Sequence, residues 1–130
     1  MITQEIIDRL WDNATEVPDR DTNAWRFDPC GALIQKEQYG NRDSEYGWEV
    51  DHIVSKAFLI KAGASEDEYD AEINLRAMHW ANNDSKGINY PEYKAVRTSE
   101  DGRNKRIEAF YTVNKDLQRQ LKSRFGKYGV

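Results

Sequence analysis

Apolar residues recur at helical spacing near both ends of the chain. In the N-terminal segment these positions are Ile6, Ile7, Leu10, Trp11 and Ala14. Thr3 is placed to cap this helix, and Pro18 is expected to end it because proline cannot continue a helix. In the C-terminal segment Asn114 is placed to cap a second helix. The repeating apolar positions of that helix are Leu117, Leu121 and Phe125.

The middle of the chain shows the alternation of apolar and polar residues that is typical of strands. The clearest strand is predicted over residues 48–54, and a short returning strand over 75–78. Two shorter runs, at 25–27 and 32–34, are further strand candidates. A helix over 79–86 is expected to follow the returning strand, because Gly87 is a good stop signal.

Beyond residue 91 the pattern predicts a hairpin whose strands run over 93–98 and 107–113. Asp101-Gly102 between them is a strong turn signal. With the N-terminal helix and the mixed central part, the pattern predicts an α+β fold. A length of 130 residues suits a single domain over 1–130.

Composition narrows the class of protein. No apolar run approaches the roughly 18 residues needed to cross a bilayer, so no membrane association is expected. Cys30 is the only cysteine, which excludes an internal disulfide and a cysteine-rich zinc site and fits a reducing, cytoplasmic compartment. Cys30 itself is expected to pack as a small hydrophobic residue.

The net charge of −4 conceals two parts of opposite sign. Residues 1–83 hold 8 basic and 17 acidic residues, a balance of −9, whereas residues 84–130 hold 11 and 6, a balance of +5. The acidic total excludes tight, indiscriminate coating of nucleic acid. The basic C-terminal part still permits local contact with phosphates, or attraction to the acidic part of the same chain.

Several polar residues in the central part are candidates for chemistry. Asp51 and His52 lie near the end of the predicted strand, Asn74 ends the following loop, and His79 and Asn83 share a face of the short helix. Neighbours on a regular strand point to opposite faces, so Asp51 and His52 reach one site only if the strand is ending there.

In order, these residues stand in the segments GWEVDHIVSK, NLRAMHWANNDSKG and NYP. This set resembles the HNH endonuclease family, also called ββα-metal or His-Me finger nucleases. The resemblance covers about residues 30–91 and implies a ββα-metal core there. The N-terminal helix then precedes this core, and a basic extension over about 92–130, with the hairpin and the last helix, follows it.

The resemblance also implies roles for individual residues. His52 would be the general base that activates water, and Asp51 and Asn83 would hold one divalent cation. All-oxygen ligation favours Mg²⁺ or Mn²⁺. Asn74 would fix the loop backbone and so orient His52. Family members often carry two Cys-x-x-Cys pairs; here His79 and Asn82 occupy one matching pair, so no structural zinc is expected.

Some assignments stay open. Asn82 and Asn83 are adjacent, and Asn83 is preferred because it stands nine positions after Asn74, as the family spacing implies. His79 is either a second metal or phosphate ligand or a packed histidine beside Trp80, and packing is favoured.

Lys86 and Arg76 are candidate phosphate contacts or ordinary charged side chains. Further basic candidates in the extension are Arg103, Lys105, Arg106, Arg119, Lys122 and Arg124.

The expected function is metal-dependent hydrolysis of DNA phosphodiester bonds, with double-stranded DNA as the substrate. The alternative is a catalytically silent module of the same fold that docks on DNA or on a larger complex. The choice between DNA and RNA, and the oligomeric state, stay open at this point.

Overall fold

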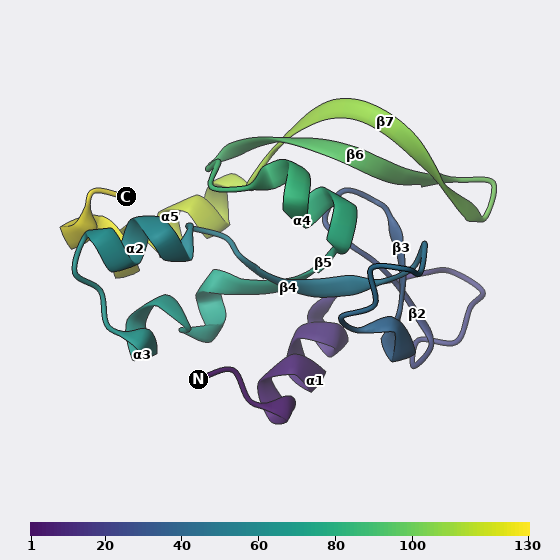
Figure 1. Cartoon of the computed structure of the whole chain (residues 1–130), viewed down its shortest axis with the longest axis horizontal. Helices are drawn as coiled ribbons and strands as arrows, with labels where there is room; N and C mark the ends of the chain where they lie inside the picture. Colours follow the sequence, from purple (N-terminus) through teal and green to yellow (C-terminus); the bar gives the residue numbers. More distant parts are fainter.

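The computed structural model describes all residues from Met1 to Val130 and confirms the α+β class (Figure 1). Its α-helices are α1 (Gln4–Asn13), α2 (Lys56–Lys61), α3 (Glu66–Tyr69), α4 (Trp80–Lys86) and α5 (Lys115–Phe125). Its strands are β1 (Thr15–Glu16), β2 (Trp25–Phe27), β3 (Leu33–Gln35), β4 (Trp48–His52), β5 (Leu75–His79), β6 (Glu92–Glu100) and β7 (Arg103–Thr112). Short 3₁₀ turns are η1 (Lys36–Gln38), η2 (Glu72–Asn74) and η3 (Gly126–Tyr128).

The antiparallel pair β4–β5 lies at the centre of the molecule. Its register places Asp51 opposite Arg76 and Trp48 opposite His79. Helix α4 begins directly after β5 and lies between this pair and the long hairpin β6–β7 (Figure 1). Helix α1 contacts β5 from the other side. The chain therefore contains a strand-strand-helix unit, β4–β5–α4, that is covered on both faces.

Two groups of buried apolar side chains hold these layers together. The larger one contains Cys30, Ile53, Val54, Leu59, Met78, Tyr93, Ala95, Val113, Leu121 and Phe125. The smaller one contains Trp11, Ile34, Trp48 and Ala77. Burying side chains of this size contributes about 1.5–3 kcal/mol each, so the β4–β5 pair is fixed from two sides.

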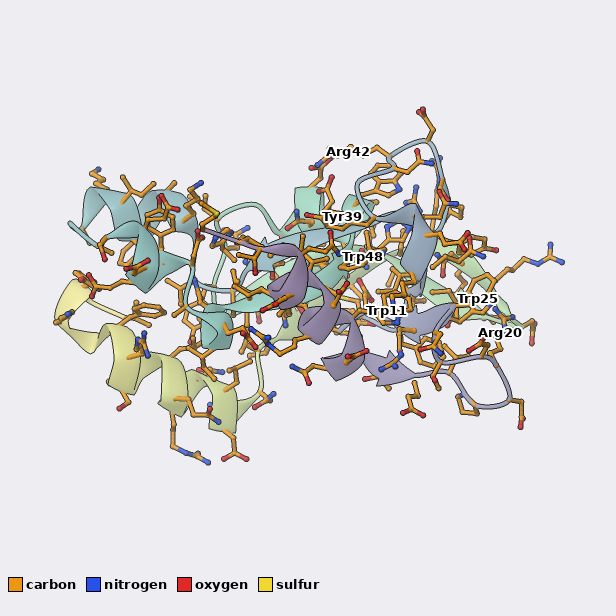
Figure 2. All side chains as sticks on the ribbon, turned by 90° about the horizontal axis from the view of Figure 1, so that it is seen from below. Trp11, Arg20, Trp25, Tyr39, Arg42 and Trp48 are labelled. Atoms are coloured by element: carbon orange, nitrogen blue, oxygen red, sulfur yellow. The ribbon has the colours of Figure 1, made fainter.

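An aromatic group anchors the start of β4 (Figure 2). The Trp48 ring lies 5.4 Å from that of Trp11 and 4.8 Å from that of Tyr39, measured between centroids. These contacts connect α1, the segment after η1 and β4. Elsewhere Arg20 stacks its guanidinium carbon 4.5 Å from the Trp25 ring centroid. Trp11 and Trp48 are both fully buried.

Most elements predicted from the sequence are present, with corrections at their ends. Thr3 and Asn114 cap α1 and α5 as expected. The prediction that Pro18 ends the first helix is wrong, because α1 stops at Asn13. The next residues become extended and pair with β2. The hairpin strands are longer than predicted and meet at a turn that contains Asp101, which has a φ of 54°.

The long connection from Ile53 to Ile73 is mostly helical. Ser55 caps α2, and Ser65 forms a capping box with Glu68 at the start of α3. No helix of this fold combines the length and the apolar character that crossing a bilayer requires.

Candidate active site

The carboxylate of Asp51 lies between β4, β5 and α4 and is bound by two cationic side chains. Its Oδ2 accepts a hydrogen bond from Arg76 Nε at 2.9 Å, and its Oδ1 lies 3.2 Å from Lys86 Nζ. Only 3% of the Asp51 side chain is exposed. Buried charges persist only when they are paired and hydrogen-bonded, so Asp51, Arg76 and Lys86 act as one unit.

Lys86 is completely buried, which corrects both interpretations of it as an exposed phosphate contact or a solvated lysine. Its Nζ donates to the backbone carbonyls of His52 and Ile53, at 3.1 and 3.0 Å. Burial lowers the pKa of Lys86 below its ordinary value, whereas the contact with Asp51 opposes this shift. The ammonium group therefore fastens the end of α4 to the end of β4.

Arg76 is also mostly buried, and its guanidinium carbon lies 5.3 Å from the Tyr93 ring centroid. Its Nη2 is the only buried side-chain nitrogen or oxygen atom without a hydrogen-bond partner. Arg76, a candidate phosphate contact or ordinary charged side chain in the sequence, is paired with Asp51 in the structure.

Asn83 faces β4 one turn before Lys86. Its Nδ2 donates to Glu49 Oε1 at 3.0 Å. Glu49 and Asp51 are two residues apart on β4 and therefore share a face, which is the face that α4 covers. Burial alone would raise the pKa of Glu49, but hydrogen bonds from Arg42 and Asn83 lower it below its usual value.

Asn82 points in a different direction and is fully buried. Its Nδ2 donates to Asp28 Oδ2 and to the Arg97 carbonyl, while its Oδ1 accepts from the backbone N–H groups of Val96 and Arg97. These bonds use both Nδ2 and Oδ1 of Asn82 and join α4 to β6. Of the two adjacent asparagines, Asn83 is the one left half-buried beside the carboxylates.

Asp28 is a buried carboxylate that the sequence did not single out. It accepts hydrogen bonds from the backbone N–H groups of Cys30, Ala32 and His79 and from the Asn82 side chain. Burial raises its pKa, and these four donors oppose the shift. A detectable signal existed, because the segment Asp28-Pro29-Cys30-Gly31 has Asp, Pro and Gly at the positions that a turn favours, and an Asp there bonds to the backbone two residues on.

His79 is packed, which confirms the favoured interpretation. Its Nδ1 accepts from Ala81 N, and its Nε2 lies 2.6 Å from the Glu45 carbonyl oxygen, which can only accept. Its ring stacks on Trp80 with centroids 5.5 Å apart. Burial lowers the pKa of His79, so the ring stays neutral and fixes the start of α4.

Asn74 is fully buried and bonds to the chain on both sides of the long connection. Its Oδ1 accepts from Val54 N at 2.8 Å, and its Nδ2 donates to the carbonyls of Val54 and Tyr69, both at 3.1 Å. The Asn74 carbonyl also accepts from Ile53 N. The two residues that follow His52 are thus held by a single asparagine.

His52 ends β4, and its side chain contacts Asp70 rather than Asp51. Its Nε2 lies 2.8 Å from Asp70 Oδ1, and the side chain is 17% exposed. The Tyr69 ring lies 6.3 Å away, between centroids. Neither Asp51 nor Asn83 forms a hydrogen bond with the His52 ring. The predicted residues have different partners: Asp51 contacts Arg76 and Lys86, Asn83 contacts Glu49, and His52 contacts Asp70.

The oxygen donors near α4 suit a hard cation by chemistry. Asp51 and Asn83, with Glu49 beside them, offer carboxylate and amide oxygens of the kind that Mg²⁺ and Mn²⁺ prefer. No group of three or more His, Cys, Asp or Glu side chains is arranged to hold a metal ion. Both Asp51 oxygens already contact cationic side chains, so a metal ion at Asp51 would compete with Lys86 or Arg76.

The fold and site together define an α+β protein with a carboxylate, a histidine and asparagines around a strand-strand-helix unit. Comparisons with protein-family models, with curated proteins and with solved structures give no match to this chain.

Proposed function

We propose that this protein is a metal-dependent endonuclease of the HNH type that hydrolyses phosphodiester bonds in DNA. The observation that carries the proposal is the threefold hydrogen bonding of Asn74, which holds the backbone directly after His52. A general base has to be positioned within hydrogen-bond reach of the proton it takes, and this asparagine fixes the base-bearing strand end.

In the proposed reaction His52 accepts a proton from water as the water oxygen attacks phosphorus. The bond from phosphorus to the leaving 3′ oxygen then breaks, and this oxygen takes a proton from solvent water, which gives 5′-phosphate and 3′-hydroxyl ends. Neutral imidazole suits this step at physiological pH. Asp51 and Asn83 would hold one Mg²⁺ or Mn²⁺, which stabilises negative charge developing on the phosphate oxygens when it is bound.

Lys86 gives this site an internal cation. In the absence of a divalent ion its ammonium group neutralises Asp51 and keeps α4 docked on β4. Without such a partner an isolated buried carboxylate would be strongly destabilising. The protein can therefore keep the site folded before metal and substrate arrive.

The proposed substrate is a duplex held by local contacts. The basic balance of residues 84–130 supplies charge for phosphate binding, while the acidic remainder limits binding elsewhere. Binding is therefore expected to weaken steeply as salt increases.

Cleavage of supercoiled plasmid tests the proposal. Wild-type protein should nick or cut the plasmid with Mg²⁺ or Mn²⁺ and stop when EDTA is added. His52→Ala and Asp51→Asn should lose activity, whereas Asp43→Asn, an exposed carboxylate outside the site, should retain it. Equal cutting by the wild type and His52→Ala, or no cutting by either on DNA, would overturn the proposal.

A second candidate is a catalytically silent binding module with the same fold. It is favoured by one observation, that both Asp51 oxygens are already bound by Arg76 and Lys86. Calorimetric titration with Mn²⁺ separates the two candidates. Binding that disappears in Asp51→Asn supports the endonuclease, and DNA binding with no Mn²⁺ binding supports the module.

A further inference from the structure

Asp70 contacts His52 but has no role in the proposed reaction. Asp70 follows α3, and 10% of its side chain is exposed. Its Oδ1 lies 2.8 Å from His52 Nε2, which is hydrogen-bonding distance for a charge-assisted bond. We propose that Asp70 is a positioning residue that keeps the proton of neutral His52 on Nε2 and leaves Nδ1 free to accept the proton of water. This inference rests on the proposed function of His52 as the base.

The assignment of the proton follows from what each atom can do. An ionised carboxylate accepts hydrogen bonds and cannot donate one, so the nitrogen that faces it has to carry the proton. Burial alone would raise the pKa of Asp70, but hydrogen bonds from His52 and from the N-terminal amine lower it. Asp70 is thus ionised near neutral pH.

The other ring nitrogen is open. Nδ1 of His52 forms no hydrogen bond, and the only buried side-chain nitrogen or oxygen without a partner is Arg76 Nη2. Nδ1 therefore reaches solvent. In a neutral ring protonated at Nε2, this atom holds the lone pair that a general base requires.

The same asparagine that fixes the end of β4 also fixes Asp70. Asn74 Nδ2 donates to the carbonyl of Tyr69, the residue directly before Asp70, and to the carbonyl of Val54, two residues after His52. The backbone N–H of Asp70 bonds to Glu66 O. Both members of the pair are therefore attached through one buried side chain, which suits a fixed orientation of the ring.

Other charged groups surround the pair without replacing Asp70. The N-terminal amine of Met1 lies 3.2 Å from Asp70 Oδ2 and 2.8 Å from Glu66 Oε1. Lys56 Nζ lies 5.3 Å from the Tyr69 ring centroid. Neither Glu66 nor Lys56 forms a hydrogen bond with the imidazole. Glu66 is therefore a suitable control, because its carboxylate contacts the N-terminal amine but not His52.

Nitrogen-15 NMR of the histidine rings tests the inference without relying on cleavage. In the wild type we expect neutral His52 to show one tautomer, with the proton on Nε2 and slow exchange of that proton with water. Asp70→Asn, which is isosteric, and Asp70→Ala should give faster exchange of the Nε2 proton and a mixture of tautomers. Glu66→Gln should leave the His52 signals unchanged, and the signals of buried His79 report that each variant is folded.

Cleavage of plasmid provides the second readout. Asp70→Asn should lower kcat by about 10- to 100-fold with little change in KM, as expected when a group that orients a functional histidine is altered. A tautomer distribution or kcat that is the same in wild type and Asp70→Asn would overturn the role of Asp70. An inactive wild type that still shows the single Nε2–H tautomer would instead overturn the proposed function and leave the assignment of the proton standing.

Discussion

Lys86 Nζ lies 3.2 Å from Asp51 Oδ1, and both side chains are almost wholly removed from solvent. The pair joins the last turn of α4 to β4. Its ammonium group stands at the carboxylate that the proposed function assigns to a divalent ion. The stability of the unit and its affinity for metal are therefore expected to change in opposite directions when Lys86 is altered.

Lys86→Met should destabilise the protein by about 3 kcal/mol, because Asp51 keeps its buried charge and loses one of two cationic partners. Urea unfolding measures this loss. Lys105→Met is the matched control, since Lys105 forms an exposed ion pair with Glu100 and should change stability by less than about 1 kcal/mol. If Lys86→Met were as stable as the wild type, the buried pair would not contribute in the way described.

Asn74→Asp should destabilise the fold by at least about 3 kcal/mol. The new carboxylate is nearly isosteric but cannot donate to the Val54 and Tyr69 carbonyls, and it places unpaired negative charge beside them. Asn89→Asp, at an exposed position, should have little effect. Chemical denaturation measures both variants, and equal midpoints for Asn74→Asp and Asn89→Asp would contradict this expectation.

The adjacent asparagines should separate into a structural and a functional residue. Asn82→Ala leaves several buried groups of Asp28 and β6 without partners and should cost about 3 kcal/mol. Asn83→Ala removes one half-buried hydrogen bond to Glu49 and should cost less than about 1.5 kcal/mol.

Thermal unfolding and the plasmid assay together check this pair. Under the proposed function Asn83→Ala is folded but loses metal-dependent cleavage. Retention of full cleavage by Asn83→Ala would remove it from the proposed ligand set.

Glu68 should make stability depend on acid pH. Its hydrogen bonds to Tyr128 and Lys127 lower its pKa from 4.5 to about 2. A carboxyl group with a lowered pKa in the folded state stabilises the fold above the unfolded value, and this contribution is lost as pH falls from 4.5 toward about 2.

The melting temperature of the wild type should therefore fall more steeply over this range than that of Glu68→Gln. Asp67→Asn, a neighbouring residue of α3 that forms no ion pair, serves as the control. Parallel pH profiles for the wild type and Glu68→Gln would show that the contact between α3 and the C-terminal turn does not form.

Local signals in the sequence were enough to predict the framework of the fold. Thr3 and Asn114 cap helices through hydrogen bonds to residues three positions away, and the alternation around Val50 needs only the two faces of a strand. The end of α1 was misplaced because the residues after Asn13 leave the helix to pair with β2, a tertiary preference that overrides the local stop signal at Pro18.

The sequence named Asp51 and His52 as candidates but did not indicate the side chains that they contact. Asp70 meets His52 only because the connection after β4 folds into α2 and α3 and is drawn back by Asn74. Lys86 was expected at the surface, since lysine is seldom buried, and nothing in its neighbours along the chain indicates the carboxylate it meets. Glu49 was detectable, because its spacing from Asp51 places both on one strand face.

The strand-strand-helix unit depends on the four hydrogen bonds that Asp28 accepts, so it is not an independent module. Asp28 lies outside that unit, yet it holds the backbone of His79 and the side chain of Asn82, which together form the start of α4. A fragment beginning at Gly47 would leave the buried His79 N–H without an acceptor and would remove one of the two acceptors of the Asn82 amide. Transplanting the unit into another protein therefore requires carrying the segment around Asp28 with it.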